Sequence, residues 1–289
     1  MLDPALDFRA VSIGKAQRIV AKEFAHSETP MLDARVLMKA ALDVDDAYLI
    51  YHENRLLTSE EAERFHLFAS RRKSQEPIAH ITGVREFWGL EIEVEPGILV
   101  PRADSETLIS VATTRRDQTG RYRVLDLGTG SGCLLCAMLA SFKNATGLGI
   151  DINFDATLLA TRNLSSLGLS ERGKVMAGQW ATAIKGKFDI IVSNPPYIPI
   201  GENATLPKEV VGFEDPRALF SGPKGDLDYK VILESLQGLL CEGGLVVIEV
   251  GDGQAAALEE MMKTLPITGE IGLVDDLKGA PRAIFLDTQ

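Results

Sequence analysis

The sequence predicts an α/β fold, namely a Rossmann-like, mostly parallel sheet with an antiparallel last strand, preceded by a small all-helical domain. Beyond Pro101, short β-branched runs alternate with helical patterns, which is typical of a doubly wound sheet. A glycine-rich turn joins the first of these runs to an apolar helix. Before residue 76, the periodicity is helical. We therefore expect a helical domain at 1–75, a β-hairpin linker at 76–100 and the α/β domain at 101–289.

The N-terminal region carries three amphipathic helical patterns. In "VSIGKAQRIVAKEF", apolar residues from Ile13 to Phe24 fall roughly on one helical face, and "MLDARVLMKAAL" repeats the spacing from Leu32. In "LTSEEAERFHLFASRRK", Thr58 and Glu61 have the spacing of a capping box, and the closing "RRK" is expected to be a solvated helix end. This region has no catalytic constellation, so we expect it to serve in packing or partner recognition.

The linker "PIAHITGVREFWGLEIEVEPGILVPR" has the composition of a hairpin. It combines β-branched residues, glycine breaks and the alternation Leu90, Ile92, Val94. His80 stands alone among apolar neighbours, so we expect a structural histidine there.

Seven short runs are expected to be the strands of the α/β domain. Helical stretches separate the first five, and the last two lie close enough to form a hairpin. In chain order, the expected strands span 122–128, 145–152, 173–178, 188–194, 244–251, 269–276 and 282–288.

Composition narrows the function classes. The chain has 289 residues and a net charge of −11, without the basic footprint that displaces counterions from nucleic acid, so we expect no direct nucleic-acid binding. No apolar run approaches the ~18 residues of a membrane span, and the first residues lack the layout of a signal peptide.

The cysteines Cys133, Cys136 and Cys241 are too few for a disulfide framework and have no histidine cluster beside them, so we expect no metal. A cytoplasmic protein is expected, with a monomer as the default.

The first strand of the α/β domain runs into the glycine loop "DLGTGSG", which opens an apolar helix. Glycines let the backbone turn tightly and approach a ligand, and a helix N-terminus offers unpaired amide donors. Asp151 ends the second strand, where a carboxylate can accept both hydroxyls of a ribose. We therefore expect a bound nucleoside, held by Asp151 and by the loop residues Gly128, Thr129, Gly130, Ser131 and Gly132.

Two nucleoside ligands are compatible with this loop. A dinucleotide would seat its pyrophosphate at the helix dipole, but its usual fingerprint is Gly-x-Gly-x-x-Gly, and the spacing here is tighter. S-adenosylmethionine lacks a pyrophosphate and needs close backbone approach with an acid near its ammonium group. Asp126 lies where that acid would be useful.

The fourth strand ends on "SNPPY", and prolines are poor residues for a strand. The Asn194 side-chain carbonyl can accept one N–H of a planar –NH2 group, and the main-chain carbonyl of Pro195 can accept the other. Two fixed acceptors orient the nitrogen lone pair toward a sulfonium methyl and stabilise the charge that builds on nitrogen. Pro196 adds rigidity, and Tyr197 offers a flat face against an amide or a base. We predict a clamp for a planar amine at 194–197, with Asn194, Pro195 and Tyr197 as catalytic residues and S-adenosylmethionine as the methyl donor.

In combination, these motifs resemble the HemK-type protein-(glutamine) methyltransferases, which methylate the glutamine side-chain nitrogen in the Gly-Gly-Gln motif of peptide chain release factors. The resemblance covers nearly the whole chain. The matching segments are "MLDARVLM", "EPIAHITGVREFWG", "LVPRADSETL", "VLDLGTGSG", "GIDIN", "SNPPYIP", "EDPRALFSGPKGDLDYKVI" and "VIEVGDGQ". It implies a class I methyltransferase sheet, S-adenosyl-L-methionine as cofactor with S-adenosyl-L-homocysteine as product, and release factors as partners that the helical domain helps to grip.

The resemblance also implies residue roles. The glycine loop and Asp151 would hold the cofactor, with Trp180 beside the adenine and Asn194 bordering both cofactor and substrate. The substrate glutamine would be bound by Asn194, Pro195, Pro196 and Tyr197. The segments 214–217 and 222–228 would have a structural role, as a lid or wall of the site.

The sequence departs from the family pattern at several positions. His80 replaces a tyrosine, and Ala103 and Ser105 replace the proline and threonine usual after "PR". Gln179 replaces an acidic residue before Trp180, although its carbonyl could still accept from the adenine amine. None of these changes touches the clamp.

Three other functions share parts of this pattern. A related enzyme would methylate a ribosomal-protein glutamine. A nucleic-acid adenine or guanine amino-methyltransferase would use the same clamp, because a flipped base also presents a planar amine; the net charge of −11 argues against it. A protein that binds S-adenosylmethionine without turnover would have a damaged clamp, whereas 194–197 are intact.

Overall fold

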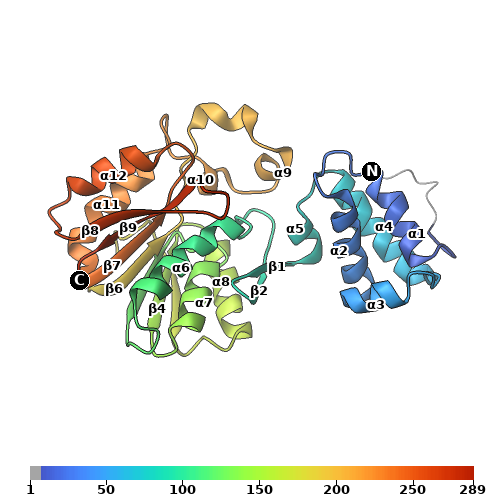
Figure 1. The fold of residues 1–289 in the computed structure, drawn as a ribbon, viewed down its shortest axis with the longest axis horizontal. Coiled ribbons are helices and arrows are strands. Elements are labelled where there is room, and N and C mark those ends of the chain that lie inside the picture. The colour runs from blue at the N-terminus through green and yellow to red at the C-terminus, as the bar shows by residue number, and fades with distance from the viewer. Residues whose placement is uncertain (1–7) are drawn as a thin grey trace. The chain divides into compact units, whose positions relative to one another are not determined.

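The computed structural model describes residues 8–289, and the chain divides into two compact units (Figure 1). One unit contains the residues through Val84 together with Pro207–Phe213. The other contains Arg85–Leu206 and Glu214–Gln289. Across the described residues, no helix is long and apolar enough to cross a membrane.

The first unit is helical, as predicted for the N-terminal region. Its core includes Ile13, Phe24 and Leu37, all fully buried. The predicted capping box at Thr58 is confirmed, but the predicted apolar face of the second helix is partly wrong, because Leu32 is 56% exposed. The helices through Val84 are α1 (Ile13–Ala21), α2 (Pro30–Leu42), α3 (Asp46–Tyr51), α4 (Ser59–Lys73) and α5 (Ile78–Thr82).

The end of α4 is not simply solvated, so the expectation for "RRK" is wrong at Arg72. This side chain is buried, and its Nε donates to Asp33 Oδ2 at 2.8 Å. Its Nη1 donates to Glu209 Oε2, also at 2.8 Å. Glu209 belongs to α9 (Lys208–Val211), so a buried guanidinium ties the Pro207–Phe213 segment into the helical unit.

The linker forms the predicted hairpin, from β1 (Val84–Phe87) and β2 (Leu90–Glu93). Its first part is the helix α5 instead of extended chain. Gly83, with φ of 80°, ends that helix in the left-handed region. His80 on α5 is buried, and its ring centroid lies 6.4 Å from that of Phe213.

The second unit contains a seven-stranded sheet in which all seven predicted strands form. Its order is β5-β4-β3-β6-β7-β9-β8, and the pairings among the first five strands are parallel. The last strand, β9, is antiparallel to both neighbours and lies between β7 and β8. The strands are β3 (Arg123–Leu127), β4 (Thr146–Asp151), β5 (Gly173–Ala177), β6 (Phe188–Ser193), β7 (Leu240–Glu249), β8 (Glu270–Asp275) and β9 (Pro281–Asp287).

Helices cover both faces of this sheet, so the unit has three layers (Figure 1). One apolar core lies under α6 (Glu106–Arg115), α7 (Cys133–Ser141) and α8 (Phe154–Ser166). The other lies under α11 (Leu227–Leu239) and α12 (Ala255–Lys263). Short helical turns at η1 (Ala103–Ser105), η2 (Ile200–Thr205) and α10 (Pro216–Leu219) lie in the connections.

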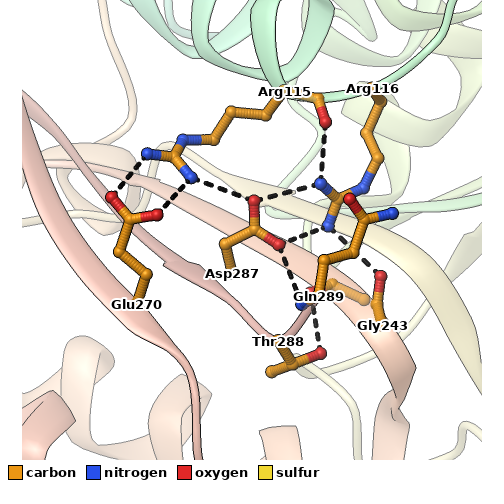
Figure 2. A network of polar contacts seen from close by, with 8 residues as sticks. Arg115, Arg116, Gly243, Glu270, Asp287, Thr288 and Gln289 are labelled. Carbon is orange, nitrogen blue, oxygen red and sulfur yellow. Dashed lines mark hydrogen bonds and ion pairs between the residues drawn. The ribbon is translucent and has the colours of Figure 1, made fainter.

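The C-terminal end of α6 is fixed to the sheet by two arginines (Figure 2). Arg116 is buried, and its Nη2 donates to Asp287 Oδ1 at 2.7 Å and to the Gly243 carbonyl at 3.2 Å. Arg115 bridges Asp287 and Glu270, and its guanidinium carbon lies 3.6 Å above the Phe285 ring. The helix that follows Ser105 is therefore held at its far end to β8 and β9.

We expect Asp287→Asn to destabilise the protein by about 3 kcal/mol, because it leaves the buried Arg116 guanidinium without its counter-charge. Urea unfolding followed by circular dichroism measures the change. Asp275→Asn, which removes an exposed carboxylate from β8, is the matched control and should change stability by less than about 0.5 kcal/mol. Equal effects of the two substitutions would contradict this expectation.

Candidate active site

A cavity of about 300 Å³ opens where β3, β4 and β6 reach their carboxyl ends. Of the residues expected at the site, those that line it are Gly128, Thr129, Gly130, Ser131, Asp151, Gln179, Trp180, Asn194 and Pro196. Its lining does not include Asp126, Gly132, Pro195 and Tyr197. The glycine loop, the end of β4 and the turn after β6 thus meet at one cavity.

The glycine loop owes its shape to three left-handed residues. Gly128, Gly130 and Gly132 have φ of 75°, 54° and 81°, a region that glycine adopts without strain. The amides of Gly128 and Thr129 both donate to the Ile150 carbonyl at 2.9 Å, which ties the loop to β4. A Cβ at Gly132 would lie 2.9 Å from the Cβ of Ala160, so close packing against α8 also requires glycine.

Asp126 supports this loop from beneath. Its carboxylate is fully buried, and Oδ2 accepts from Thr129 Oγ1 at 2.6 Å and from Leu135 N at 3.2 Å. Within residues 8–289, Oδ1 has no hydrogen-bond partner. Burial raises the pKa of Asp126 to about 7, against the opposing effect of the two hydrogen bonds. This position fits a role in shaping the loop, and the expected contact with an ammonium group stays a prediction.

Asp151 presents its carboxylate at the cavity wall. Its Oδ2 accepts from Gly130 N and its Oδ1 from Asn153 N, both at 2.8 Å. Burial raises its pKa. Each oxygen retains a lone pair, so a pair of ribose hydroxyls could donate to this fixed carboxylate.

Trp180 forms an aromatic wall of the cavity beside the glycine loop. Its backbone is left-handed, with φ of 48°, and its Nε1 donates to Asp228 Oδ1 at 3.0 Å. A Cβ at Gly128 would lie 3.2 Å from its Cζ3, so the indole packs directly over that glycine. Gln179 is exposed at the cavity rim, and its expected contact with adenine stays a prediction.

The turn after β6 is held by a buried carboxylate. Asn194 Nδ2 donates to Ser105 Oγ at 3.0 Å, and Ser105 Oγ donates to Glu249 Oε2. The Tyr197 hydroxyl donates to Glu249 Oε1 at 3.1 Å. Burial raises the pKa of Glu249, which is 1% exposed, and that of Tyr197. Tyr197 directly, and Asn194 through Ser105, are therefore both tied to the Glu249 carboxylate.

The main chain of Tyr197 is enclosed as well. Its carbonyl accepts from Gln254 Nε2 at 2.9 Å. Gly225 has φ of 73°, and a Cβ there would lie 2.1 Å from the same carbonyl. Gly225 comes from "SGPKG", so the segment expected to wall the site also fixes the clamp.

The rest of that wall lies along the cavity. Asp215, Arg217 and Phe220 line it, and the segment is anchored where Arg102 Nη2 donates to Glu214 Oε1 at 2.6 Å. The main chain after the clamp pairs with this segment, because Ile198 N donates to the Leu219 carbonyl at 3.0 Å.

The sequence motifs assign no role at the site to Ser105 or Glu249, although Ser105 is a departure from the family pattern and Glu249 lies in a matching segment. Asp228 is expected there only as the end of the wall segment 222–228. An acidic residue at the end of a buried strand was the one available signal for Glu249, because such a charge needs partners.

The cavity fits S-adenosylmethionine by the chemistry of its lining. Trp180 and the aliphatic residues Ile98, Ile150 and Ile152 offer an apolar slot for an adenine. Asp151 supplies a carboxylate for a ribose, and the side-chain-free Gly128 and Gly130 admit close approach to the backbone.

Comparison with known proteins decides the family. Residues 15–83 match the model of the PrmC N-terminal domain, and residues 102–209 match that of the methyltransferase small domain. The release factor glutamine methyltransferase of Bradyrhizobium diazoefficiens is 39% identical over 282 residues, covering 96% of this chain and 95% of that protein. This chain belongs to the release factor glutamine methyltransferase family. A second relative with the same name, from Rhodospirillum rubrum, is 41% identical and is matched over 79% of its length and 89% of this chain.

The methyltransferase has the sheet of a class I methyltransferase, as predicted, and it is an S-adenosylmethionine-dependent enzyme. Among solved structures, the hMettl16 catalytic domain in complex with MAT2A 3′UTR hairpin 1 resembles it with a TM-score of 0.56. That likeness covers 79% of this chain and 80% of the other at 16% identity. At this identity it shows the shared fold alone.

We expect the pH dependence of stability to report the buried Asp126. Its folded pKa of about 7 lies above the unfolded value of about 3.9, so the folded protein retains a proton that the unfolded chain releases between these values. This contribution to stability is complete below about pH 4 and falls as the pH rises to about 7. Asp126→Asn cannot titrate, so from pH 5 to pH 8 its stability should rise relative to wild type, by on the order of 1–3 kcal/mol in urea unfolding. A stability difference that does not vary with pH would rule this out.

Proposed function

We propose that this methyltransferase transfers a methyl group from S-adenosylmethionine to the side-chain amide nitrogen of the glutamine in the Gly-Gly-Gln motif of peptide chain release factors. The observation that carries the chemistry is the Asn194 side chain at the cavity wall, with Nδ2 engaged by Ser105 and Oδ1 left as an acceptor. The relatives named above support the release factor as the partner.

The proposed chemistry follows from two acceptors. An amide nitrogen is a weak nucleophile because its lone pair is delocalised into the carbonyl. Asn194 Oδ1 and the Pro195 carbonyl each accept one N–H of the substrate amide, which fixes the nitrogen and favours the positive charge that develops on it. When bound, S-adenosylmethionine supplies a methyl group on an electrophilic sulfonium. The rigid Pro195-Pro196 turn holds both acceptors in place, since each proline ring fixes its φ.

The cofactor is placed by different residues. We assign Asp151 to the ribose hydroxyls, Trp180 to the adenine, and the glycine loop to the methionine portion, with Asp126 setting the shape of that loop. The helical unit contributes to gripping the release factor. Because release factors act on ribosomes, we place the reaction in the cytoplasm.

Methyl transfer from labelled S-adenosylmethionine tests this function directly. The purified enzyme is offered release factor, ribosomal proteins and duplex DNA in parallel. We expect label on the release factor, and none on a release factor whose Gly-Gly-Gln glutamine is changed to alanine. Label on a ribosomal protein or on DNA alone would refute the proposed partner while leaving the clamp chemistry intact.

Asn194→Ala separates the clamp from cofactor binding. We expect turnover to fall by about 100-fold or more, because one transition-state hydrogen bond is lost, while the Kd for S-adenosylmethionine stays within roughly tenfold. Single-turnover kinetics and calorimetric titration measure the two quantities.

Asp151→Ala is the counterpart, since it removes a carboxylate assigned to the cofactor. It should mainly raise the Kd for S-adenosylmethionine, and turnover at saturating cofactor should fall far less than in Asn194→Ala. Equal losses of binding and turnover in Asn194→Ala would show that the division between clamp and cofactor residues is wrong.

A further inference from the structure

Ser105 and Glu249 lie 144 residues apart in the chain, yet they form one buried hydrogen-bond chain with Asn194. Ser105 is 2% exposed and Glu249 is 1% exposed. Bulk solvent cannot reach the hydrogen-bonding groups of these two side chains, so each group depends on partners within the protein.

The order of donors and acceptors in this chain is fixed by chemistry. When Glu249 is ionised, its carboxylate only accepts, so the single Ser105 proton is directed to Glu249 Oε2. Ser105 Oγ then has only lone pairs to offer to Asn194. The Asn194 amide must therefore turn its Nδ2 toward Ser105, at 3.0 Å, and its Oδ1 away from Ser105.

We propose that Ser105 and Glu249 are positioning residues that hold the Asn194 amide in the single orientation in which Oδ1 accepts from the methyl-accepting nitrogen. This deepens the proposed function and rests on it. Turned by 180°, the amide would present –NH2 to a substrate –NH2, so two donors would face each other and the substrate hydrogen bond would be lost. The carboxylate acts through Ser105, without touching the substrate.

The neighbouring strands and α6 hold the three hydrogen-bonded residues in place. Glu249 ends β7, which pairs with β6 on one side and β9 on the other, and β6 runs directly into Asn194. Ser105 precedes α6, whose far end is fixed to Asp287 (Figure 2). The second oxygen of Glu249 accepts from Tyr197, so the carboxylate cannot turn away from Ser105 without breaking that bond.

A double-mutant cycle on turnover tests this proposal. Ser105→Ala should lower kcat about tenfold, with the Kd for S-adenosylmethionine within about twofold of wild type. In an Asn194→Ala background, the same substitution should change kcat by less than about twofold, because Ser105 acts only through Asn194. Equal fold-losses in both backgrounds would overturn the proposal, since a general structural role would be additive.

Two further variants test whether loss of the Ser105 hydroxyl is what lowers turnover. Ser105→Thr keeps the hydroxyl and should restore most of the turnover lost in Ser105→Ala. Ser110→Ala makes the same chemical change at an exposed position of α6 and should leave turnover as in wild type. If Ser105→Thr were as impaired as Ser105→Ala, the hydroxyl would not be the responsible group.

A measurement without substrate separates this inference from the proposed function. The ¹⁵N–¹H signal of the Asn194 side-chain amide is assigned by its loss in Asn194→Ala. In Ser105→Ala it should shift and exchange with solvent about tenfold faster, while Ser105→Thr keeps it close to wild type. An unchanged signal in Ser105→Ala would overturn the positioning role. If the signal changes in Ser105→Ala but the wild-type enzyme labels no release factor, the inferred Asn194 orientation would stand and the proposed methyl acceptor would be wrong.

Discussion

The alignment of β6 between β3 and β7 is the constraint on which the site depends. Leu127 pairs with Ser193, whose Oγ also donates to the Leu127 carbonyl at 2.7 Å, and Ser193 pairs in turn with Ile248. Leu127, Ser193 and Ile248 are therefore level with one another, and the residues after them are the glycine loop, Asn194 and Glu249, the last residue of β7. A slip of one residue in β6 would reverse the faces of its side chains and separate Asn194 from Ser105.

Buried carboxylates give this edge of the sheet its rigidity. Asp126, Asp151 and Glu249 all have raised pKa values because burial disfavours their charged forms. Each accepts two hydrogen bonds, and these fix the loop, the cavity wall and the clamp respectively. Burying the charges costs free energy, which these hydrogen bonds partly offset, and the bonds also restrict the polar groups to one arrangement.

Much of the fold and of the cavity was predictable because its signals are local. Alternating apolar runs gave all seven strands, and the capping box at Thr58 marked the start of α4. The glycine loop, Asp151 and the NPPY turn each stand at the end of a strand, and parallel strands bring such ends to one edge. The predictions for the end of α4 and for one face of α2 were wrong, because Asp33 and Arg72 form a buried ion pair that hydrophobic periodicity does not reveal.

The sequence by itself determined which segments could bind a nucleoside and a planar amine, because glycines, prolines and strand ends restrict the backbone within a few residues. Only the tertiary structure decided that Asp126 lies beneath the loop, outside the cavity lining. It also decided that Ser105 and Glu249 form a buried hydrogen-bond chain with Asn194. These contacts join residues far apart in the chain, and a hydrogen bond between distant residues leaves no periodic trace in either segment.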